Sequence, residues 1–176
     1  DNSVGAAVIY DQNDRYIKGK PPLDLSDIGQ VAVSFEKYSL TPFGGEPIAY
    51  IVDIDGTVAK MNGRSPYDYT KVSEDLPNSS VIEVVQCLAD AGAWILFTSG
   101  RPESCREDTE KWLIENVDVP NWSILMRTTG DTRADYIVKG ELFDKSIRHS
   151  YNVLGVFDDR KQVVDFWRSI GLTCFQ

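Results

Sequence analysis

Four aspartates and one serine follow apolar runs at three separate places in this chain. They are Asp53 and Asp55 in Asp-Ile-Asp-Gly-Thr, Ser99 in Thr-Ser-Gly-Arg, and Asp158 and Asp159 in Asp-Asp-Arg. A carboxylate directly after a buried strand is costly to remove from water unless it is paired or bound to a metal. A single acid of this kind is explained equally well as a helix N-cap. Capping does not explain the whole set, which predicts a site where charged groups converge.

The chemistry that these residue types favour is phosphoryl transfer to an aspartate. Asp53 and Asp55 lie two positions apart, so in an extended strand their side chains point to the same side. Two such acids can divide the work, one ionised beside a metal ion and the other keeping a proton. Asp158 or Asp159 would complete an oxygen shell for Mg²⁺. Ser99 can donate a hydrogen bond to a phosphoryl oxygen, and Lys139 supplies positive charge.

The elements that must position these residues alternate in type from residue 47 onward. Continuous apolar runs predict buried parallel strands at 48–52, 93–97, 122–126, 153–157 and 172–175. Apolar residues at helical spacing predict helices between them, at 79–91, 102–117, 131–147 and 160–170. This alternation indicates an α/β fold with a doubly wound parallel sheet. In such a sheet the site forms outside the carboxyl ends of the strands, which is where these acids and the serine fall.

Length and composition narrow the function classes. The chain has 176 residues, which suits one domain with a short appendage. With 18 basic and 27 acidic residues its net charge is −9, which argues against histone-like or repressor-like binding to nucleic acid. Neither a membrane span nor a signal peptide is expected. Three cysteines without a CxxC pair and a single histidine disfavour a structural zinc site, and we expect a cytoplasmic location.

Residues 1–46 differ in character from the rest of the chain. Glycine and proline interrupt this part repeatedly, and its apolar runs are short. We interpret it as an N-terminal extension or the remnant of an upstream domain, and none of its motifs indicates a function. The predicted catalytic domain comprises residues 47–176.

The order and spacing of four motifs make the chain similar to a known family. Asp-Ile-Asp-Gly-Thr comes first, then Ser-Gly-Arg, Arg-Ala-Asp-Tyr-Ile-Val-Lys and Asp-Asp-Arg, with Arg64 between the first two. This series resembles the haloacid dehalogenase-like phosphatases, and most closely the phosphatase domain of phage-type polynucleotide kinase-phosphatases. The resemblance covers about residues 47–176. It implies a Rossmann-like haloacid dehalogenase fold, and the short gaps between the motifs leave no room for a large cap domain.

The resemblance implies a chemical role for each matching residue. Asp53 would attack phosphorus and form an aspartyl-phosphate, while Asp55 would protonate the leaving sugar oxygen and then activate water. Ser99 and Lys139 would bind the transferring phosphoryl group. A further implication is a Mg²⁺ ion held by Asp53, by the backbone carbonyl of Asp55 and by the Asp158-Asp159 pair. Of that pair we favour Asp158 as the direct ligand and Asp159 as its support.

Four further residues receive roles around this centre. Arg64 and Arg101 resemble clamps for a substrate phosphate, because a planar guanidinium suits two oxygens. Asp135 lies one helical turn before Lys139 and would orient it. Arg133 either binds substrate or is a solvated residue at the start of a helix. Two tyrosines near Arg64, Tyr67 and Tyr69, either stack on a base or pack in the protein.

The function that follows from the resemblance is removal of the 3′-phosphate from DNA or RNA ends, with 2′,3′-cyclic phosphates as a further candidate substrate. A site without a large cap suits a bulky polynucleotide, and a local positive site can grip one terminal phosphate within an acidic body. A kinase would need a GxxxxGK loop, which this chain lacks, so any kinase domain of a parent protein would lie upstream. The alternatives are a small-molecule nucleotidase or phosphatase on the same scaffold, and a non-catalytic binding module.

Overall fold

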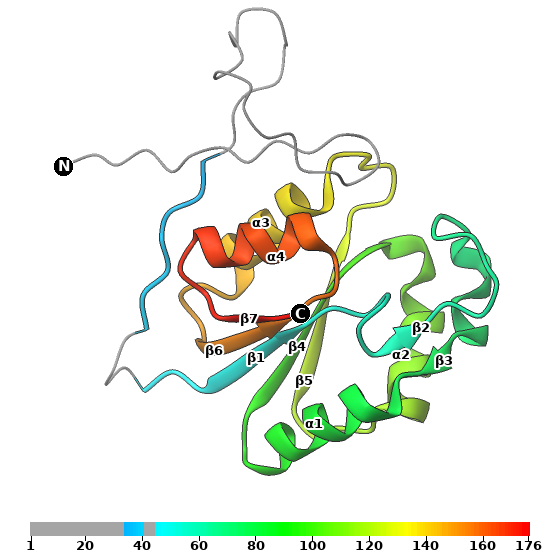
Figure 1. The fold of residues 1–176 in the computed structure, drawn as a ribbon, viewed down its shortest axis with the longest axis horizontal. Helices are drawn as coiled ribbons and strands as arrows, with labels where there is room; N and C mark the ends of the chain where they lie inside the picture. Colours follow the sequence, from blue (N-terminus) through cyan, green and yellow to red (C-terminus); the bar gives the residue numbers. More distant parts are fainter. Residues whose placement is uncertain (1–33, 41–44) are drawn as a thin grey trace, which may run out of the picture.

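The computed structural model describes residues 34–40 and 45–176, which are built around one parallel sheet (Figure 1). Its five strands lie in the order β5-β4-β1-β6-β7, and every neighbouring pair is parallel. Their bounds are β1 Ile48–Val52, β4 Trp94–Pro102, β5 Trp122–Arg127, β6 Asn152–Phe157 and β7 Cys174–Phe175. The strand that carries Asp53 at its end is central, with apolar cores on both faces. The predicted α/β class and the parallel sheet are confirmed.

Helices cover both faces of this sheet. They are α1 Ser79–Asp90, α2 Arg106–Asn116, α3 Asp135–Ser146 and α4 Lys161–Ser169. Residues of α1 and α2 pack in one core with Val52 and Phe97, whereas residues of α3 and α4 pack in the other with Ile51 and Leu96. Figure 1 shows α1 on one side of the sheet and α3 and α4 on the other. Because side chains alternate along each strand, one strand supplies both cores.

Two boundaries differ from the expected ones in ways that affect the site. Strand β4 continues to Pro102 instead of ending at residue 97, so Ser99 and Arg101 lie inside the strand. Helix α3 begins at Asp135, four residues later than expected. The preceding segment stays a loop because Gly130 has φ +88° and because Arg127 donates to the backbone carbonyls of Asp131 and Arg133.

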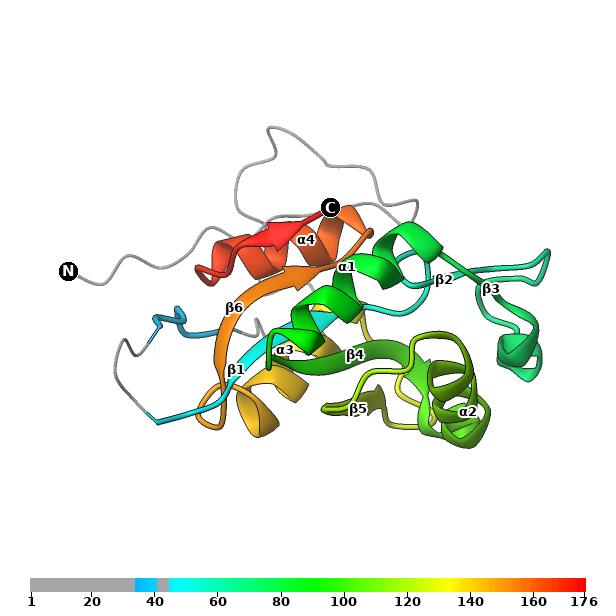
Figure 2. The same cartoon turned by 90° about the horizontal axis from the view of Figure 1, so that it is seen from below.

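A small second sheet lies within the segment that follows β1. Strands β2 (Ala59–Lys60) and β3 (Leu76–Pro77) pair antiparallel, and a 3₁₀ helix, η1 (Tyr69–Glu74), lies between them. Figure 2 shows this pair beyond the end of β1. These strands were not predicted from the sequence, because two residues are too few for an alternating pattern to emerge. The insertion is small, as the spacing of the motifs predicted.

Part of the expected N-terminal extension is packed on the domain. The hydroxyl of Tyr38 donates to the carbonyl of Tyr151 (3.1 Å) and accepts from the backbone N–H of Val153 (2.9 Å). Phe35 packs edge-on against Phe166 at 5.0 Å between ring centroids. Residues 1–33 and 41–44 lie outside the described residues, and the boundary at residue 46 stays a prediction. In the described ranges we find no helix long and apolar enough to cross a membrane.

Candidate active site

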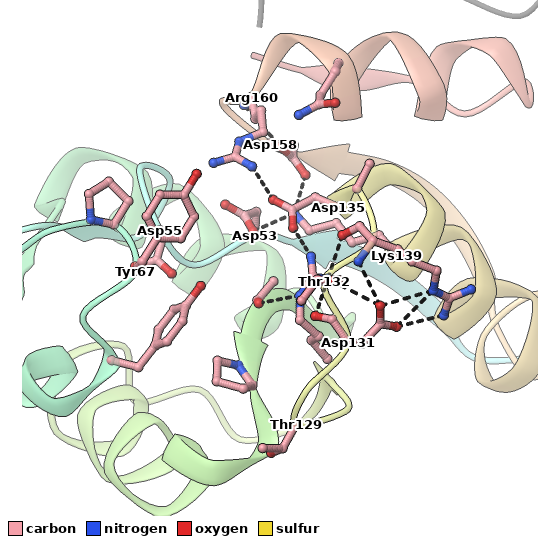
Figure 3. A pocket seen from close by; sticks show the side chains of 18 of the residues that line it. Asp53, Asp55, Tyr67, Thr129, Asp131, Thr132, Asp135, Lys139, Asp158 and Arg160 are labelled. Atoms are coloured by element: carbon pink, nitrogen blue, oxygen red, sulfur yellow. Dashed lines mark hydrogen bonds and ion pairs between the residues drawn. The ribbon is translucent and has the colours of Figure 1, made fainter. Parts of the chain in front are cut away.

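A cavity of about 600 Å³ lies at the carboxyl ends of the central strands. Its lining includes residues that follow β1 and β6, together with the end of β5 and the first turns of α3. Figure 3 shows Asp53, Asp55 and Asp158 gathered around this space. Residues far apart in sequence, among them Asp53 and Asp158, therefore meet at one place, as the strand-end pattern predicted.

Lys139 lies at the floor of the cavity between two aspartates. Its Nζ donates to Asp53 Oδ1 at 2.6 Å and to Asp158 Oδ2 at 2.7 Å, and its side chain is 3% exposed. Burial alone would lower the pKa of Lys139, but the charges of Asp158 and Asp53 outweigh burial and raise it. The structure therefore keeps a positive charge directly beside the predicted nucleophile.

The pKa of Asp53 departs strongly from its ordinary value. Burial raises the pKa of Asp53 to about 8, with Lys139 opposing the rise and the Asp158 charge adding to it. The hydroxyl of Thr57 lies 3.4 Å from its Oδ2. A cation added beside Asp53 would favour its ionised form, which is the form that a nucleophile needs.

Three carboxylates come close enough together to hold a metal ion. Oxygen atoms of Asp53, Asp158 and Asp159 lie within 4.8 Å of one another. Hard oxygen ligands of this kind fit a divalent cation such as Mg²⁺. The cluster includes Asp159, which the sequence analysis gave a supporting role, and it does not include the side chain of Asp55.

The glycine of Asp-Ile-Asp-Gly-Thr makes this cluster possible. Gly56 has φ +88°, and a Cβ at that position would lie 2.1 Å from Asp159 Oδ2. Any other residue would strain the backbone and displace the Asp159 carboxylate from its place over the turn. The glycine therefore lets the turn after β1 and the turn after β6 approach each other.

Asp55 faces the cavity between two guanidinium groups. Arg101 donates from Nε to Oδ2 (2.9 Å) and from Nη2 to Oδ1 (2.8 Å), and Arg64 donates from Nη2 to Oδ1 (2.5 Å). Burial alone would raise the pKa of Asp55, but the hydrogen bonds and charges of Arg101 and Arg64 hold it below its ordinary value. The residue pattern predicted that one acid of the pair keeps a proton, and the family resemblance implied that this acid is Asp55. The structure differs because two arginines distant in sequence reach it.

Asp75 is a residue of the site that the sequence analysis missed. Its side chain is fully buried and accepts from Arg64 Nε and Nη2 and from Arg101 Nη2, each at 2.7 Å. Its backbone carbonyl accepts from Trp112 Nε1 at 2.8 Å. Asp75 follows η1 in a segment without a periodic pattern, so its sequence context carries no signal. It balances the charge of the two arginines and fixes them against Asp55.

Arg64 and Arg101 do not lie where a substrate clamp would. The side chains are 1% and 0% exposed, and their donors are directed at Asp55 and Asp75. Arg101 also donates from Nη1 to the hydroxyl of Thr109 at 3.3 Å. The two arginines stand behind Asp55 and hold it, a placement that does not favour direct contact with a phosphate.

Asp135 has partners other than the expected Lys139. It accepts from Arg127 Nη2 and, at 2.5 Å, from Arg160 Nη1. Its position at the first residue of α3 turns it toward the ends of β5 and β6, where these arginines lie. Arg127, another residue that the sequence analysis missed, also donates from Nε to the carbonyl of Gly100 at 2.9 Å. These pairs join three strand ends across one side of the cavity.

The two remaining predicted residues lie in contrasting places. Ser99 is fully buried in β4, where its Oγ accepts from the backbone N–H of Arg101 at 3.2 Å. Arg133 is 47% exposed at the rim and pairs with Asp131 (2.7 Å) and Glu141 (2.6 Å). The solvated-surface interpretation of Arg133 fits these contacts, and its role in substrate binding stays a prediction.

Comparison with known proteins agrees with this geometry. The model of the family described as the phosphatase domain of polynucleotide kinase PNKP matches residues 47–176. A protein of Autographa californica nuclear polyhedrosis virus, whose name describes a bifunctional polynucleotide kinase/RNA ligase, is 40% identical over 140 residues. That match covers 78% of this chain and 20% of the viral protein, so the chain spans about a fifth of this relative.

Solved structures that resemble this chain include chains of RNA repair complexes. A chain in the structure of the Pnkp1/Rnl/Hen1 RNA repair complex is 37% identical with a TM-score of 0.70, covering 84% of this chain and 46% of that one. A second Pnkp1/Rnl/Hen1 complex contains a chain 40% identical with a TM-score of 0.71, covering 78% and 49%. The class C acid phosphatase from Bacillus anthracis, 17% identical with a TM-score of 0.51 over 75% of this chain and 67% of its own, shares the fold alone.

Proposed function

Because residues 47–176 belong to the family of polynucleotide kinase phosphatase domains, and the chain is therefore a phosphomonoester hydrolase, we propose that it is a Mg²⁺-dependent polynucleotide 3′-phosphatase. Its role would be to heal DNA or RNA ends before ligation. The observation that carries the proposal is the grouping of Asp53, Lys139 and Asp158 at 2.6 and 2.7 Å, with Asp55 in the same cavity.

In the first chemical step an Asp53 oxygen attacks phosphorus in line with the bond to the sugar oxygen. The new bond makes an aspartyl-phosphate, the bond from phosphorus to the sugar oxygen breaks, and that oxygen takes a proton from Asp55. Lys139 offsets negative charge on the transferring group. A hydrogen bond from Ser99 to that group stays a prediction, because the Ser99 hydroxyl is buried in β4. Because Arg64 and Arg101 favour the ionised form of Asp55, this step uses the minor protonated form of the carboxyl, which the negative charge of a bound substrate phosphate would favour.

In the second step water attacks the phosphorus of the aspartyl-phosphate. The ionised Asp55 takes a proton from this water, the bond from phosphorus to Asp53 breaks, and inorganic phosphate leaves. The Arg64 and Arg101 pairs hold the Asp55 carboxylate in one orientation, which this base needs in order to reach the water. Both steps balance with water as the only added reactant.

Asp53, Asp158 and Asp159 would hold the Mg²⁺ ion, with the backbone carbonyl of Asp55 as a further ligand. When bound, the ion would stabilise negative charge on the phosphoryl oxygens and favour the ionised form of Asp53. The three carboxylates support this assignment because they are the only such group of three acids found in the described part of the chain.

The experiment that tests the proposal measures phosphate release from 3′-phosphorylated DNA and RNA oligonucleotides, with and without Mg²⁺, against nucleoside 3′-monophosphates. We expect Mg²⁺-dependent release from the oligonucleotides and slower release from the monophosphates. Brisk turnover of monophosphates with negligible turnover of oligonucleotides would favour a small-molecule nucleotidase instead. No turnover of any phosphate ester would favour a binding module.

A pair of variants tests the nucleophile. Asp53→Asn removes the carboxylate that forms the acyl phosphate and should abolish phosphate release. The matched control is Asp90→Asn, which changes an exposed acid at the end of α1 and should leave the rate within twofold of the wild type. Activity that survives Asp53→Asn would remove Asp53 from its assigned role.

A further inference from the structure

The cavity has one aromatic wall, formed by Met61, Pro66, Tyr67 and Tyr69. We propose that Tyr67 stacks on the base of the nucleotide that carries the terminal phosphate, and so selects nucleic-acid ends over simple phosphate esters. The inference rests on the proposed function and deepens it, because it names a part of the substrate that the site reads besides the phosphate.

Packing does not explain Tyr67. Tyr67 is 81% exposed, more than any other large hydrophobic residue in the described part of the chain. Tyr69 differs, since it is half-buried and packs against the core beneath α1 and α2. Of the two interpretations that the sequence left open, packing fits Tyr69, and an external partner fits Tyr67. A tyrosine ring exposed beside a cavity leaves its flat apolar face available to a partner such as a base.

The two sides of the cavity match the two parts of a nucleotide. Figure 3 shows Tyr67 on one side and Asp131, Asp135 and Arg160 on the other. The aromatic wall offers flat apolar surface, while the facing wall carries charged and hydroxyl groups, among them Arg127 and Thr129. A cavity of about 600 Å³ exceeds what one phosphate fills, so a base and a sugar also fit.

The loop that bears Tyr67 is held in place by its neighbours. Arg64, three residues earlier, is fixed to Asp55 and Asp75. The backbone N–H of Tyr67 donates to Ser65 Oγ (3.3 Å), and Asp68 caps η1 by accepting from the N–H of Thr70 (3.2 Å). The ring is therefore presented from a fixed turn whose position is tied to that of the acid Asp55. A turn whose backbone is ordered in advance loses little entropy on binding.

Stacking also suits the charge of this protein. A net charge of −9 gives little general attraction for a polynucleotide, so contact beyond the terminal phosphate must come from another interaction. Stacking on an aromatic ring accepts every base, because each has a π-face. We therefore expect the site to depend on the presence of a terminal base and to be indifferent to its identity.

The test uses two 3′-phosphorylated oligonucleotides of the same sequence, one with a normal terminal nucleotide and one with an abasic tetrahydrofuran residue in its place. For the wild type, kcat/KM should be about tenfold higher with the base present, the usual scale of one stacking contact. Tyr67→Ala should lose about tenfold on the normal substrate and stay within twofold on the abasic one. Tyr67→Phe keeps the ring and should restore the preference for the base.

A binding measurement separates recognition from the chemical step. In the Asp53→Asn background, a terminal 2-aminopurine should be quenched on binding, and the added Tyr67→Leu change should remove most of the quenching. The matched control is Leu76→Ala, an exposed apolar residue on β3 outside the cavity lining, which should leave the quenching and the base preference unchanged.

Each outcome bears on the inference. Equal losses on both substrates in Tyr67→Ala, or a wild type indifferent to the base, would overturn stacking while leaving the 3′-phosphatase intact. Absence of turnover on both oligonucleotides by the wild type would overturn the proposed function and this inference together. Loss of base preference in Tyr67→Ala, regained in Tyr67→Phe, supports it.

Discussion

Asp53 and Asp55 are separated by one residue, yet they lie in two very different surroundings. Asp53 belongs to a lysine-centred cluster with Lys139 and Asp158, in which burial raises its pKa to about 8. Asp55 belongs to an arginine-centred cluster with Arg64 and Arg101, which lowers its pKa below the ordinary value.

The difference shows how neighbouring acids receive separate tasks. The lysine-centred cluster has two carboxylates near one ammonium and a third acid, Asp159, nearby, so it has capacity for a further cation. The arginine-centred cluster has two guanidiniums for two carboxylates, Asp55 and Asp75, and is balanced without one. In the proposed mechanism this difference would draw the metal to Asp53 and leave Asp55 as a separately held proton carrier.

The largest effect on rate and stability should come from removing the lysine of the lysine-centred cluster. Lys139→Met leaves Asp53 and Asp158 facing each other without their buried cation, so we expect kcat to fall by at least about 10³ and stability by about 3–5 kcal/mol. Steady-state kinetics and urea unfolding measure the two effects. Lys111→Met, on an exposed lysine, is the control and should change stability by less than about 0.5 kcal/mol. Retained activity in Lys139→Met would remove the lysine from the reaction.

Breaking the arginine-centred cluster should have the next largest effect. Asp75→Asn keeps the shape of the residue but leaves two buried guanidiniums with a single carboxylate, so we expect a loss of about 3 kcal/mol and a fall in kcat/KM of about a hundredfold. Thermal unfolding and kinetics are the measurements. Asp165→Asn removes a surface ion pair with Lys161 and is the matched control. Wild-type kinetics in Asp75→Asn would show that Asp55 needs no such support.

A smaller effect should separate the clusters by their response to metal. Asp159→Asn removes one carboxylate from the lysine-centred cluster, and we expect the Mg²⁺ concentration for half-maximal rate to rise about tenfold. Arg64→Lys, in the other cluster, should lower the rate without shifting that concentration. Mg²⁺ titrations of both variants make the comparison. Equal shifts would mean that one charge network serves both acids.

The smallest effect is expected outside both clusters. Arg133→Ala breaks only exposed pairs with Asp131 and Glu141, so we expect stability within about 0.5 kcal/mol of the wild type and kcat/KM within about twofold. Oligonucleotide kinetics at low salt would detect a larger contribution. A tenfold loss there would instead assign Arg133 to substrate binding.

The fold and the acids were predictable because their signals are local. The apolar runs that end at Asp53 and Asp158 predict buried strands, and the strand-end rule places their acids together. Helix boundaries were less accurate, as at Asp135, because the loop before α3 depends on a side chain of β5, Arg127. The two-residue strands β2 and β3 left no pattern to detect.

The sequence by itself determined the residue types and the order of the strand ends, and with them a site rich in carboxylates beside one lysine. Only the tertiary structure decided which cation each acid meets. Asp75 reaches Arg64 and Arg101 from a segment without periodicity, and the exposure of Tyr67 depends on how the turn after Arg64 is held. Charge interactions depend on distance in space, and distances between residues far apart in sequence are set by folding.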